Sequence, residues 1–373
     1  MGLFIGLMSG TSLDGVDAVL ADTRGSAPLR DLAFVHRPFA PDLRAECLAL
    51  NTAGANELHR AALVGNALAR LYAQAVHDLL QQAGLQPRDI NALGAHGQTV
   101  RHRPGEFDAT GYTLQLLNGA LLAEWSGIDV VCDLRSRDVA AGGQGAPLVP
   151  AFHAACFAQP GCDVAVLNLG GIANLTLLPA TGPVRGFDCG PANVLMDLWA
   201  QRCTGQPCDF EGRVSASGRV VPALLARALA EPFLAQAPPK STGRDLFDAG
   251  WLERWLAAAD APAPAPQDVA ATLAEFTALA AVQALGRHAA GTTRLLVCGG
   301  GTRNAHLMRR LVALAGPAIQ VGTTADCGVD PGRVECLAFA WLAHAFTERR
   351  PGNLVEVTGA AGLRVLGALH PSG

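Results

Sequence analysis

The sequence predicts an α/β protein made of two similar halves with mixed sheets. Strand-like segments alternate with helical segments along most of the 373 residues. The chain opens on two apolar runs joined by a small-residue turn at 9–15, and a second hairpin of the same design occupies 163–178. A chain of this length is more readily divided between two domains than packed around one core.

Helical periodicity is clearest at 57–84, and Gly84 is the expected end of that helix. Its predicted apolar face comprises Leu58, Val64, Leu68, Leu71, Ala75 and Leu79. Further helices are expected at 119–126, from 268 onwards, at 304–315 with Asn304 or Thr302 as N-cap, and from about 333. Strands are expected at 92–95, 114–117, 129–132 and 295–298. The Gly-rich segment 140–150 is the expected crossing between the halves, and the Ala/Pro segment 257–267 a surface connection.

The composition limits the class of protein. Half of the chain is hydrophobic and 16% is charged, which predicts large buried cores. The net charge of -4 argues against general nucleic-acid binding. No signal peptide and no uninterrupted membrane-spanning segment is expected. The ten cysteines lack metal-site spacing and are expected to be reduced, mostly buried thiols of a cytoplasmic protein.

The two hairpin turns are candidates for holding phosphate groups. Glycine lets the backbone approach a ligand, and hydroxyl or amide side chains at the turn can bond anionic oxygens. A third Gly-rich turn, 299–301, follows a predicted buried strand and enters a helix, which suits adenine, ribose or phosphate. The alternatives are that Gly-rich turns simply occur in hairpins and that the third turn serves tight packing of strand and helix. Neither a P-loop nor a G-x-G-x-x-G pattern is present.

Polar clusters supply candidates for the chemistry. Asp188 lies between a strand-like segment and a Gly-Pro helix start, where it can act as a general base or cap the helix. The loops 96–104 and 133–138 suit a polyhydroxylated or carboxylated ligand, because arginine grips carboxylates in a bidentate manner. His96 can equally be a structural histidine, and with His102 it offers too few ligands for a metal. Glu335 can be a simple first-turn charge.

Seven segments together resemble the anhydro-N-acetylmuramic acid kinase family across essentially the whole chain. They are MSGTSLDGVD (8–17), HGQTVRHRP (96–104), RSRDVAAGGQGAPLVPAFH (135–153), NLGGIANLT (168–176), FDCGPANVLMD (187–197), STGRDLF (241–247) and CGGGTRN (298–304). Asp248 departs from the pattern, which has Asn after STGRDLF.

The resemblance implies a member of the sugar kinase, Hsp70 and actin superfamily, with a ribonuclease H-like sheet in each lobe and ATP in the cleft between the lobes. The expected lobes are 1–135 plus about 345–373, and 136–344. The implied reaction opens the 1,6-anhydro ring of 1,6-anhydro-N-acetylmuramic acid with water and phosphorylates O6, giving N-acetylmuramic acid 6-phosphate and ADP in cell-wall recycling. Family members often pair as homodimers, and no nucleic-acid or membrane partner is expected.

By the same resemblance Asp188 is the catalytic base, and Mg²⁺ arrives with ATP rather than at a dedicated protein site, with Asp14 as the candidate to orient it. His96, Thr99, Arg135 and Glu335 are the candidate sugar contacts. The candidate ATP contacts are Gly10, Thr11, Ser12, Leu13, Asp14, Gly15, Val16, Asp17, Gly170, Gly171, Asn174, Gly299, Gly300, Gly301 and Asn304.

Two rival functions stay open on the sequence. One is a kinase of the same superfamily that phosphorylates a free hydroxyl of another sugar, in which Asp188 deprotonates that hydroxyl and no water is consumed. The other is an ATP-driven binding or regulatory protein, which would carry long insertions or a further binding domain. The uptake of one water per turnover separates the first rival from the anhydro-sugar reaction.

Overall fold

The fold is described from a computed structural model that covers residues 2–10, 12–24, 29–243, 246–257 and 263–373. The chain forms two compact units, 1–156 with 333–373 (unit 1) and 157–332 (unit 2). We expected the boundaries near 135 and 345. They lie elsewhere because α13 (Val334–Thr347) packs against β1 (Leu3–Met8) and β4 (Ile90–Ala95) of unit 1. The segment 140–150 likewise belongs to unit 1, so the first crossing comes after it.

Unit 1 contains a six-stranded sheet in the order β13-β7-β4-β1-β2-β3 and a separate β5–β6 hairpin. β1 pairs antiparallel with β2 and parallel with β4, so the sheet is mixed, as predicted. The remaining strands are β2 (Gly15–Asp22), β3 (Arg30–Pro38), β5 (Gln98–Pro104), β6 (Gly111–Leu116), β7 (Val130–Cys132) and β13 (Ala368–His370). The helices are α1 (Pro41–Ala49), α2 (Glu57–Ala83), η1 (Pro87–Asp89), α3 (Gly119–Ser126), α4 (Ser136–Val139), α5 (Val149–Phe157), α13 and α14 (Val355–Thr358).

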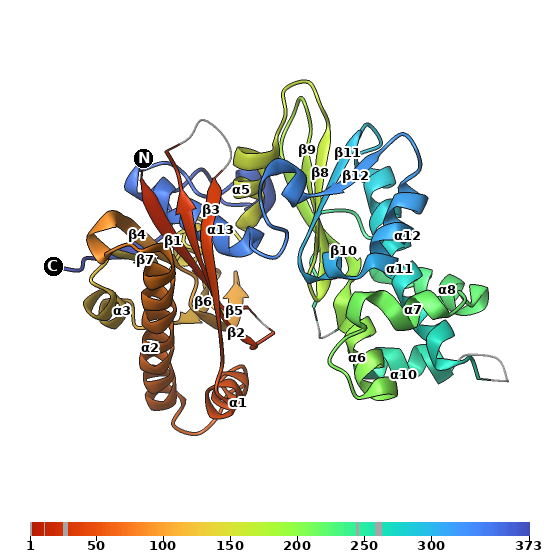
Figure 1. Cartoon of the computed structure of the whole chain (residues 1–373), viewed down its shortest axis with the longest axis horizontal. Helices are drawn as coiled ribbons and strands as arrows, with labels where there is room; N and C mark the ends of the chain where they lie inside the picture. Colours follow the sequence, from red (N-terminus) through yellow and green to blue (C-terminus); the bar gives the residue numbers. More distant parts are fainter. Residues whose placement is uncertain (1, 11, 25–28, 244–245, 258–262) are drawn as a thin grey trace. The chain divides into compact units, whose positions relative to one another are not determined.

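The long helix α2 lies along the sheet of unit 1 (Figure 1) and ends where the sequence predicts. Gly84 stops it with a left-handed φ of 67° and donates its N–H to the carbonyls of the last turn. Val64, Leu68 and Leu79 are buried, but Leu58 is 86% exposed. Leu58 was therefore wrongly placed on the apolar face, because it lies in the first turn of the helix, where periodicity alone cannot show whether a neighbour covers it.

Unit 2 repeats the topology of unit 1. Its sheet runs β10-β9-β8-β11-β12, with β8 antiparallel to β9, β9 antiparallel to β10, and β11 parallel to both β8 and β12. Unit 1 has the same order and directions in β3-β2-β1-β4-β7. The strands are β8 (Val164–Leu169), β9 (Ile172–Leu178), β10 (Arg185–Pro191), β11 (Arg294–Cys298) and β12 (Gln320–Thr323). The prediction of two similar halves is confirmed.

The helices of unit 2 enclose its core around α11 (Pro266–His288). The others are α6 (Asn193–Thr204), η2 (Phe210–Gly212), α7 (Arg213–Ser217), α8 (Pro222–Leu229), α9 (Pro232–Ala235), α10 (Ala249–Ala257), η3 (Gly300–Arg303), α12 (Ala305–Ala315) and η4 (Thr324–Cys327). In the described part of the chain α11 alone is long and apolar enough to cross a membrane, and 78% of its most apolar window is buried in the protein. It carries Asp268 and Glu275 and packs against neighbouring helices of unit 2, as a core helix does.

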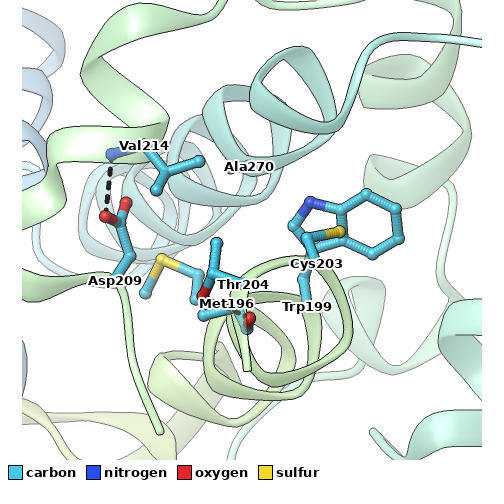
Figure 2. A pocket seen from close by; sticks show the side chains of 8 residues that line it. Met196, Trp199, Cys203, Thr204, Asp209, Val214 and Ala270 are labelled. Carbon is cyan, nitrogen blue, oxygen red and sulfur yellow. Dashed lines mark hydrogen bonds between the residues drawn. The ribbon is translucent and has the colours of Figure 1, made fainter. Parts of the chain in front are cut away.

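A small hollow opens beside α6 in unit 2 (Figure 2). It measures about 290 Å³ with its open mouth and is lined mainly by apolar side chains, among them Met196, Trp199 and Ala270. Asp209 at its edge accepts the backbone N–H of Val214 at 2.8 Å and of Ser215 at 2.9 Å. Asp209 therefore serves to start helix α7.

All ten cysteines are free, but only five of them are buried, fewer than the majority that the sequence predicts. Asp248, the residue that departs from the family pattern, accepts the N–H of Trp251 at 2.6 Å and so caps the start of α10. Asp and Asn are equally good in that position. The departure from the family pattern therefore has a local structural explanation.

Candidate active site

The turn between β1 and β2 is held in a defined shape in unit 1. Leu13 adopts a left-handed φ of 56° and donates its N–H to the Gly10 carbonyl at 3.2 Å. Ser12 and Asp14 are exposed, and the Ser12 hydroxyl donates to Asp14 Oδ1 at 2.8 Å. Thr11 lies outside the described residues. The turn therefore presents a hydroxyl and a carboxylate beside open backbone.

The strand that follows this turn carries three further predicted ATP contacts. Gly15 faces the carbonyl of Arg37 so closely that a Cβ would lie 2.3 Å from it. Val16 is fully buried in the core. Asp17 is half-buried, and its Oδ1 lies 2.7 Å from His36 Nδ1 on the neighbouring strand. Gly15 and Val16 thus pack the strand, and Asp17 is a cross-strand partner of His36.

His96 and Gln98 tie the β1–β2 turn to the next strand of the sheet. The Nδ1 of His96 bonds the Ser9 carbonyl at 3.1 Å, and the Gln98 amide donates to the Gly10 carbonyl at 3.1 Å. Burial, with the charge of Arg135, lowers the pKa of His96 to about 3. Its neutral ring can then accept at Nε2 from Arg135. Both ring nitrogens are occupied within the protein, which favours the structural interpretation of His96.

Arg135 connects His96 to the loop that follows it. Its Nη2 lies 2.9 Å from His96 Nε2, and its Nη1 donates to the Gly145 carbonyl at 2.8 Å. Burial lowers the pKa of Arg135 to about 10, while the charges of Glu335 and Asp138 act in the opposite direction. A guanidinium has five N–H groups, and the three bonds to His96 and Gly145 leave two for a ligand.

The other two predicted sugar contacts also belong to unit 1. Thr99 is half-buried on β5, where its hydroxyl accepts from Gln115 at 3.3 Å. Glu335 is exposed in the first turn of α13, close enough to Arg135 for their charges to interact. The structure therefore brings His96, Arg135 and Glu335 into one electrostatic cluster.

Asp188 lies on β10 of unit 2, at an irregularity in the pairing with β9. The register shifts between Asp188 and Gly190, and Gly190 has a φ of 146°. Oδ2 of Asp188 accepts the hydroxyl of Ser241 and the backbone N–H of Thr242, both at 2.9 Å. Burial raises the pKa of Asp188 above its ordinary value, while these two bonds act in the opposite direction. Such a carboxylate is suited to proton transfer.

The second hairpin turn, Gly170–Gly171, joins β8 to β9 and is fixed by the start of α6. The side chain of Asn193 donates to the carbonyls of Leu169 and Gly170 at 2.9 and 2.8 Å. A Cβ on Gly171 would meet nothing within 4 Å, so the turn leaves its outer face open. Asn174 lies opposite Asp188 in the sheet.

The third glycine turn follows β11. Gly299 has a φ of 85°, and a Cβ there would lie 2.4 Å from the side-chain oxygen of Asn168. Gly301 is packed against Leu169, whereas a Cβ on Gly300 would meet only the side-chain amide of Asn193, at 3.8 Å. Asn304 caps α12 by accepting the N–H of Leu307 at 2.9 Å, which confirms one of the two predicted caps. Close packing of strand and helix therefore explains two of the three glycines.

The residues present fit ATP. Gly171 leaves open backbone for a ligand, a Cβ on Gly300 would meet only the Asn193 amide at 3.8 Å, and the first turn adds the exposed Ser12 and Asp14. Among the described residues no group of three or more His, Cys, Asp or Glu side chains could hold a metal ion. Sequence reasoning assigned no role to Ser241, Thr242 or Gln98, although the unusual STGRDLF and HGQT segments were a signal for them.

Two copies of one sheet topology, each opening on a hairpin with a Gly-containing turn, define the class as an α/β protein built from two similar units. The family model for anhydro-N-acetylmuramic acid kinase matches residues 2–372, and the chain belongs to that family. It is 58% identical over 376 residues to the anhydro-N-acetylmuramic acid kinase of Variovorax paradoxus, with 99% of each chain covered. The Bordetella parapertussis protein of that name is 60% identical over 372 residues, covering 99% of this chain and 96% of that one.

Solved structures resemble the chain only distantly. Xylulose kinase from Rhodospirillum rubrum matches with a TM-score of 0.47 and 14% identity, covering 99% of this chain and 94% of that one. A ROK family glucokinase from Streptomyces griseus matches with a TM-score of 0.42 and 16% identity, covering 91% and 99%.

Proposed function

We propose that this chain is an ATP-dependent kinase that opens the 1,6-anhydro ring of 1,6-anhydro-N-acetylmuramic acid with water while it phosphorylates O6. The products are N-acetylmuramic acid 6-phosphate and ADP. Family membership over residues 2–372 supports the substrate. The observation that carries the chemistry is Asp188, a partly buried carboxylate held on a rigid strand by two hydrogen bonds.

The proposed reaction needs a base because O6 of the substrate is an ether oxygen and has no proton to lose. Asp188 takes a proton from a water molecule, and the water oxygen attacks the anomeric carbon. The bond between that carbon and O6 breaks, and O6 takes the γ-phosphoryl group of ATP as ADP leaves. A positioned base of this kind typically contributes ~10²–10⁴-fold to the rate.

Residues of the three glycine turns would hold ATP. The open backbone of Gly171 supports phosphate binding there, as does Gly300 with no close neighbour, and Ser12 and Asp14 support it at the first turn. Mg²⁺ bound to ATP would neutralise charge on the phosphates, and Asp14 is the exposed carboxylate suited to orient the waters of that ion.

Arg135 is the proposed partner of the lactyl carboxylate of the sugar, because two of its N–H groups are left for a ligand. Thr99 and Glu335 are the proposed hydroxyl contacts. His96 acts in this proposal by holding Arg135 and the β1–β2 turn rather than by touching the sugar.

We place the protein in the cytoplasm, where ATP and the products of cell-wall recycling are found. ATP and the anhydro sugar are its proposed partners, with no nucleic acid or membrane; the net charge of -4 supports the exclusion of nucleic acid. We also propose a homodimer, because members of the family often pair in this way. Light scattering of the purified protein would test it.

The test is turnover of 1,6-anhydro-N-acetylmuramic acid with ATP in ¹⁸O-water, followed by mass spectrometry of the product. One ¹⁸O at the anomeric position of a phosphorylated sugar is the expected result. Phosphorylation of another sugar without uptake of water would instead support the rival kinase. Asp188→Asn, which keeps the size of the side chain but not its basicity, should lose ~10²–10⁴-fold in kcat. Near-normal turnover of that variant would exclude Asp188 as the base.

A further inference from the structure

The loop 240–242 donates hydrogen bonds to one of the two carboxylate oxygens of Asp188 and not to the other. Oδ2 accepts both the Ser241 hydroxyl and the Thr242 N–H at 2.9 Å, and the Asp188 N–H donates to the Lys240 carbonyl at 3.1 Å. Within the described part of the chain no donor is bonded to Oδ1. The loop therefore occupies one oxygen and leaves the other for a proton.

Lys240 anchors this loop to the core of unit 2. Its ammonium group is buried, with the residue 9% exposed, and donates to the carbonyls of Phe233 and Leu234 in α9, each at 3.1 Å. It also lies 4.7 Å from the centre of the Phe233 ring, which stabilises the cation. Two of the three ammonium N–H groups are bonded, and because burying an unpaired charge is costly, these bonds hold Lys240 and the loop that follows it against α9.

The far end of the same segment is anchored as well. Phe247 is fully buried, and its ring lies 6.2 Å from that of Phe233 and 5.6 Å from that of Trp251. Phe233 thus packs against residues from both ends of the segment. The first residue of the STGRDLF segment, Ser241, therefore bonds to Asp188, and its last residue, Phe247, packs against other aromatic rings.

We infer that Ser241 and Lys240 are positioning residues for the catalytic base, which orient Asp188 so that Oδ1 receives the proton of the attacking water. The inference rests on the proposed function of Asp188. Ser241 holds Oδ2 directly, and Lys240 acts through the loop that carries Ser241 and Thr242. The carboxylate is thereby kept from rotating, and a displacement of even 1 Å in such a group can cost roughly 100-fold in rate.

The groups around Asp188 give the direction of a pH effect. The Thr242 N–H, the Ser241 hydroxyl and the charge of Lys240 all lower the pKa of Asp188, against the larger effect of burial. Cys189, its neighbour on β10, has its own pKa raised to about 12 by burial and stays neutral. Loss of the Ser241 hydroxyl therefore raises the pKa of Asp188. Because the base must be deprotonated, the acidic limb of the kcat profile then moves to higher pH.

The test compares Ser241→Ala with Ser241→Thr, which keeps the hydroxyl, and with Ser217→Ala as the matched control. Ser217 is an exposed serine of unit 2 whose hydroxyl donates to the Val214 carbonyl at 2.8 Å. We expect kcat to fall roughly 10- to 100-fold in Ser241→Ala with KM for both substrates unchanged. Ser241→Thr should recover most of the rate, and Ser217→Ala should match the parent protein.

Lys240→Met provides a second, independent measurement. We expect it to lower kcat like Ser241→Ala, and the double variant to lose little more than the worse single one, because both residues act through Oδ2. Thermal melting identifies a variant that fails to fold, in which case the Ser241 pair decides alone. If Asp188→Asn is inactive but Ser241→Ala is fully active, with the acidic limb of its kcat–pH profile unmoved, this inference alone is overturned. Active Asp188→Asn overturns the proposed function first.

Discussion

Removing the carboxylate of Asp138 should destabilise unit 1 more than most single substitutions do. Asp138 is fully buried, and it accepts the Gly145 N–H, the Asn353 side-chain amide and the Thr358 hydroxyl, each at 2.8 Å. These bonds join the loop after α4 to residues more than 200 positions later in the chain. Hydrogen bonds to a charged acceptor are among the stronger ones, and a buried donor that loses its acceptor is costly.

The expected cost follows from what each donor can do after Asp138→Ala. Thr358 keeps the Leu354 carbonyl as an acceptor at 3.3 Å, and Asn353 keeps the Gly362 carbonyl for one of its two N–H groups. The Gly145 N–H and the second Asn353 N–H are left unpaired, at about 1–3 kcal/mol each. We therefore expect a loss of about 3–4 kcal/mol in the free energy of unfolding.

The free energy of unfolding is measured by urea unfolding followed by circular dichroism, and two further variants serve as comparisons. Asp138→Asn keeps Oδ1 but turns an NH₂ group towards the Gly145 N–H, so it should cost about half as much. Asp42→Ala removes an exposed carboxylate from the first turn of α1 and should cost at most about 1 kcal/mol. An Asp138→Ala protein within about 0.5 kcal/mol of the parent would refute the reasoning, because buried donors would then have found other partners.

Three further predictions concern stability. The pKa of His96 falls from 6.5 to about 3 on folding, so only the unfolded chain binds its proton between these values. Stability should therefore fall by roughly 1.5 kcal/mol from pH 6.5 to pH 5, and urea unfolding of His96→Gln should lack that part of the slope. Gly6→Ala should lower the free energy of unfolding by about 2–4 kcal/mol, because its Cβ would lie 1.9 Å from the Cys336 carbonyl oxygen. Gly286→Ala should instead stabilise the protein, because the position lies inside α11 with open space around its Cβ. Melting temperatures equal to that of the parent protein would contradict both expectations. Asn304→Ala should cost about 1 kcal/mol through the lost cap of α12, a loss that Asn304→Ser should largely restore.

Much of the candidate site could be predicted because its parts are local in the sequence. Asp188 could be picked out by the strand and the Gly-Pro helix start around it, and the structure places it on β10, just before α6. The partners of the same residues could not be predicted. Ser241 contacts Asp188 across 53 positions, and Arg135 contacts His96 across 39, distances over which no periodicity or turn pattern extends.

The sequence by itself determined the α/β class, the two hairpins and the helix at Gly119–Ser126, and it narrowed the cap of α12 to Thr302 or Asn304, because strand alternation, helical period and capping act within a few residues. Only the tertiary structure decided that α13 and the segment 140–150 belong to unit 1, and that His96 faces inward with both nitrogens bonded. These outcomes depend on which apolar faces pack together. Because α13 is apolar on nearly every side, its hydrophobic pattern alone does not indicate which sheet it packs against.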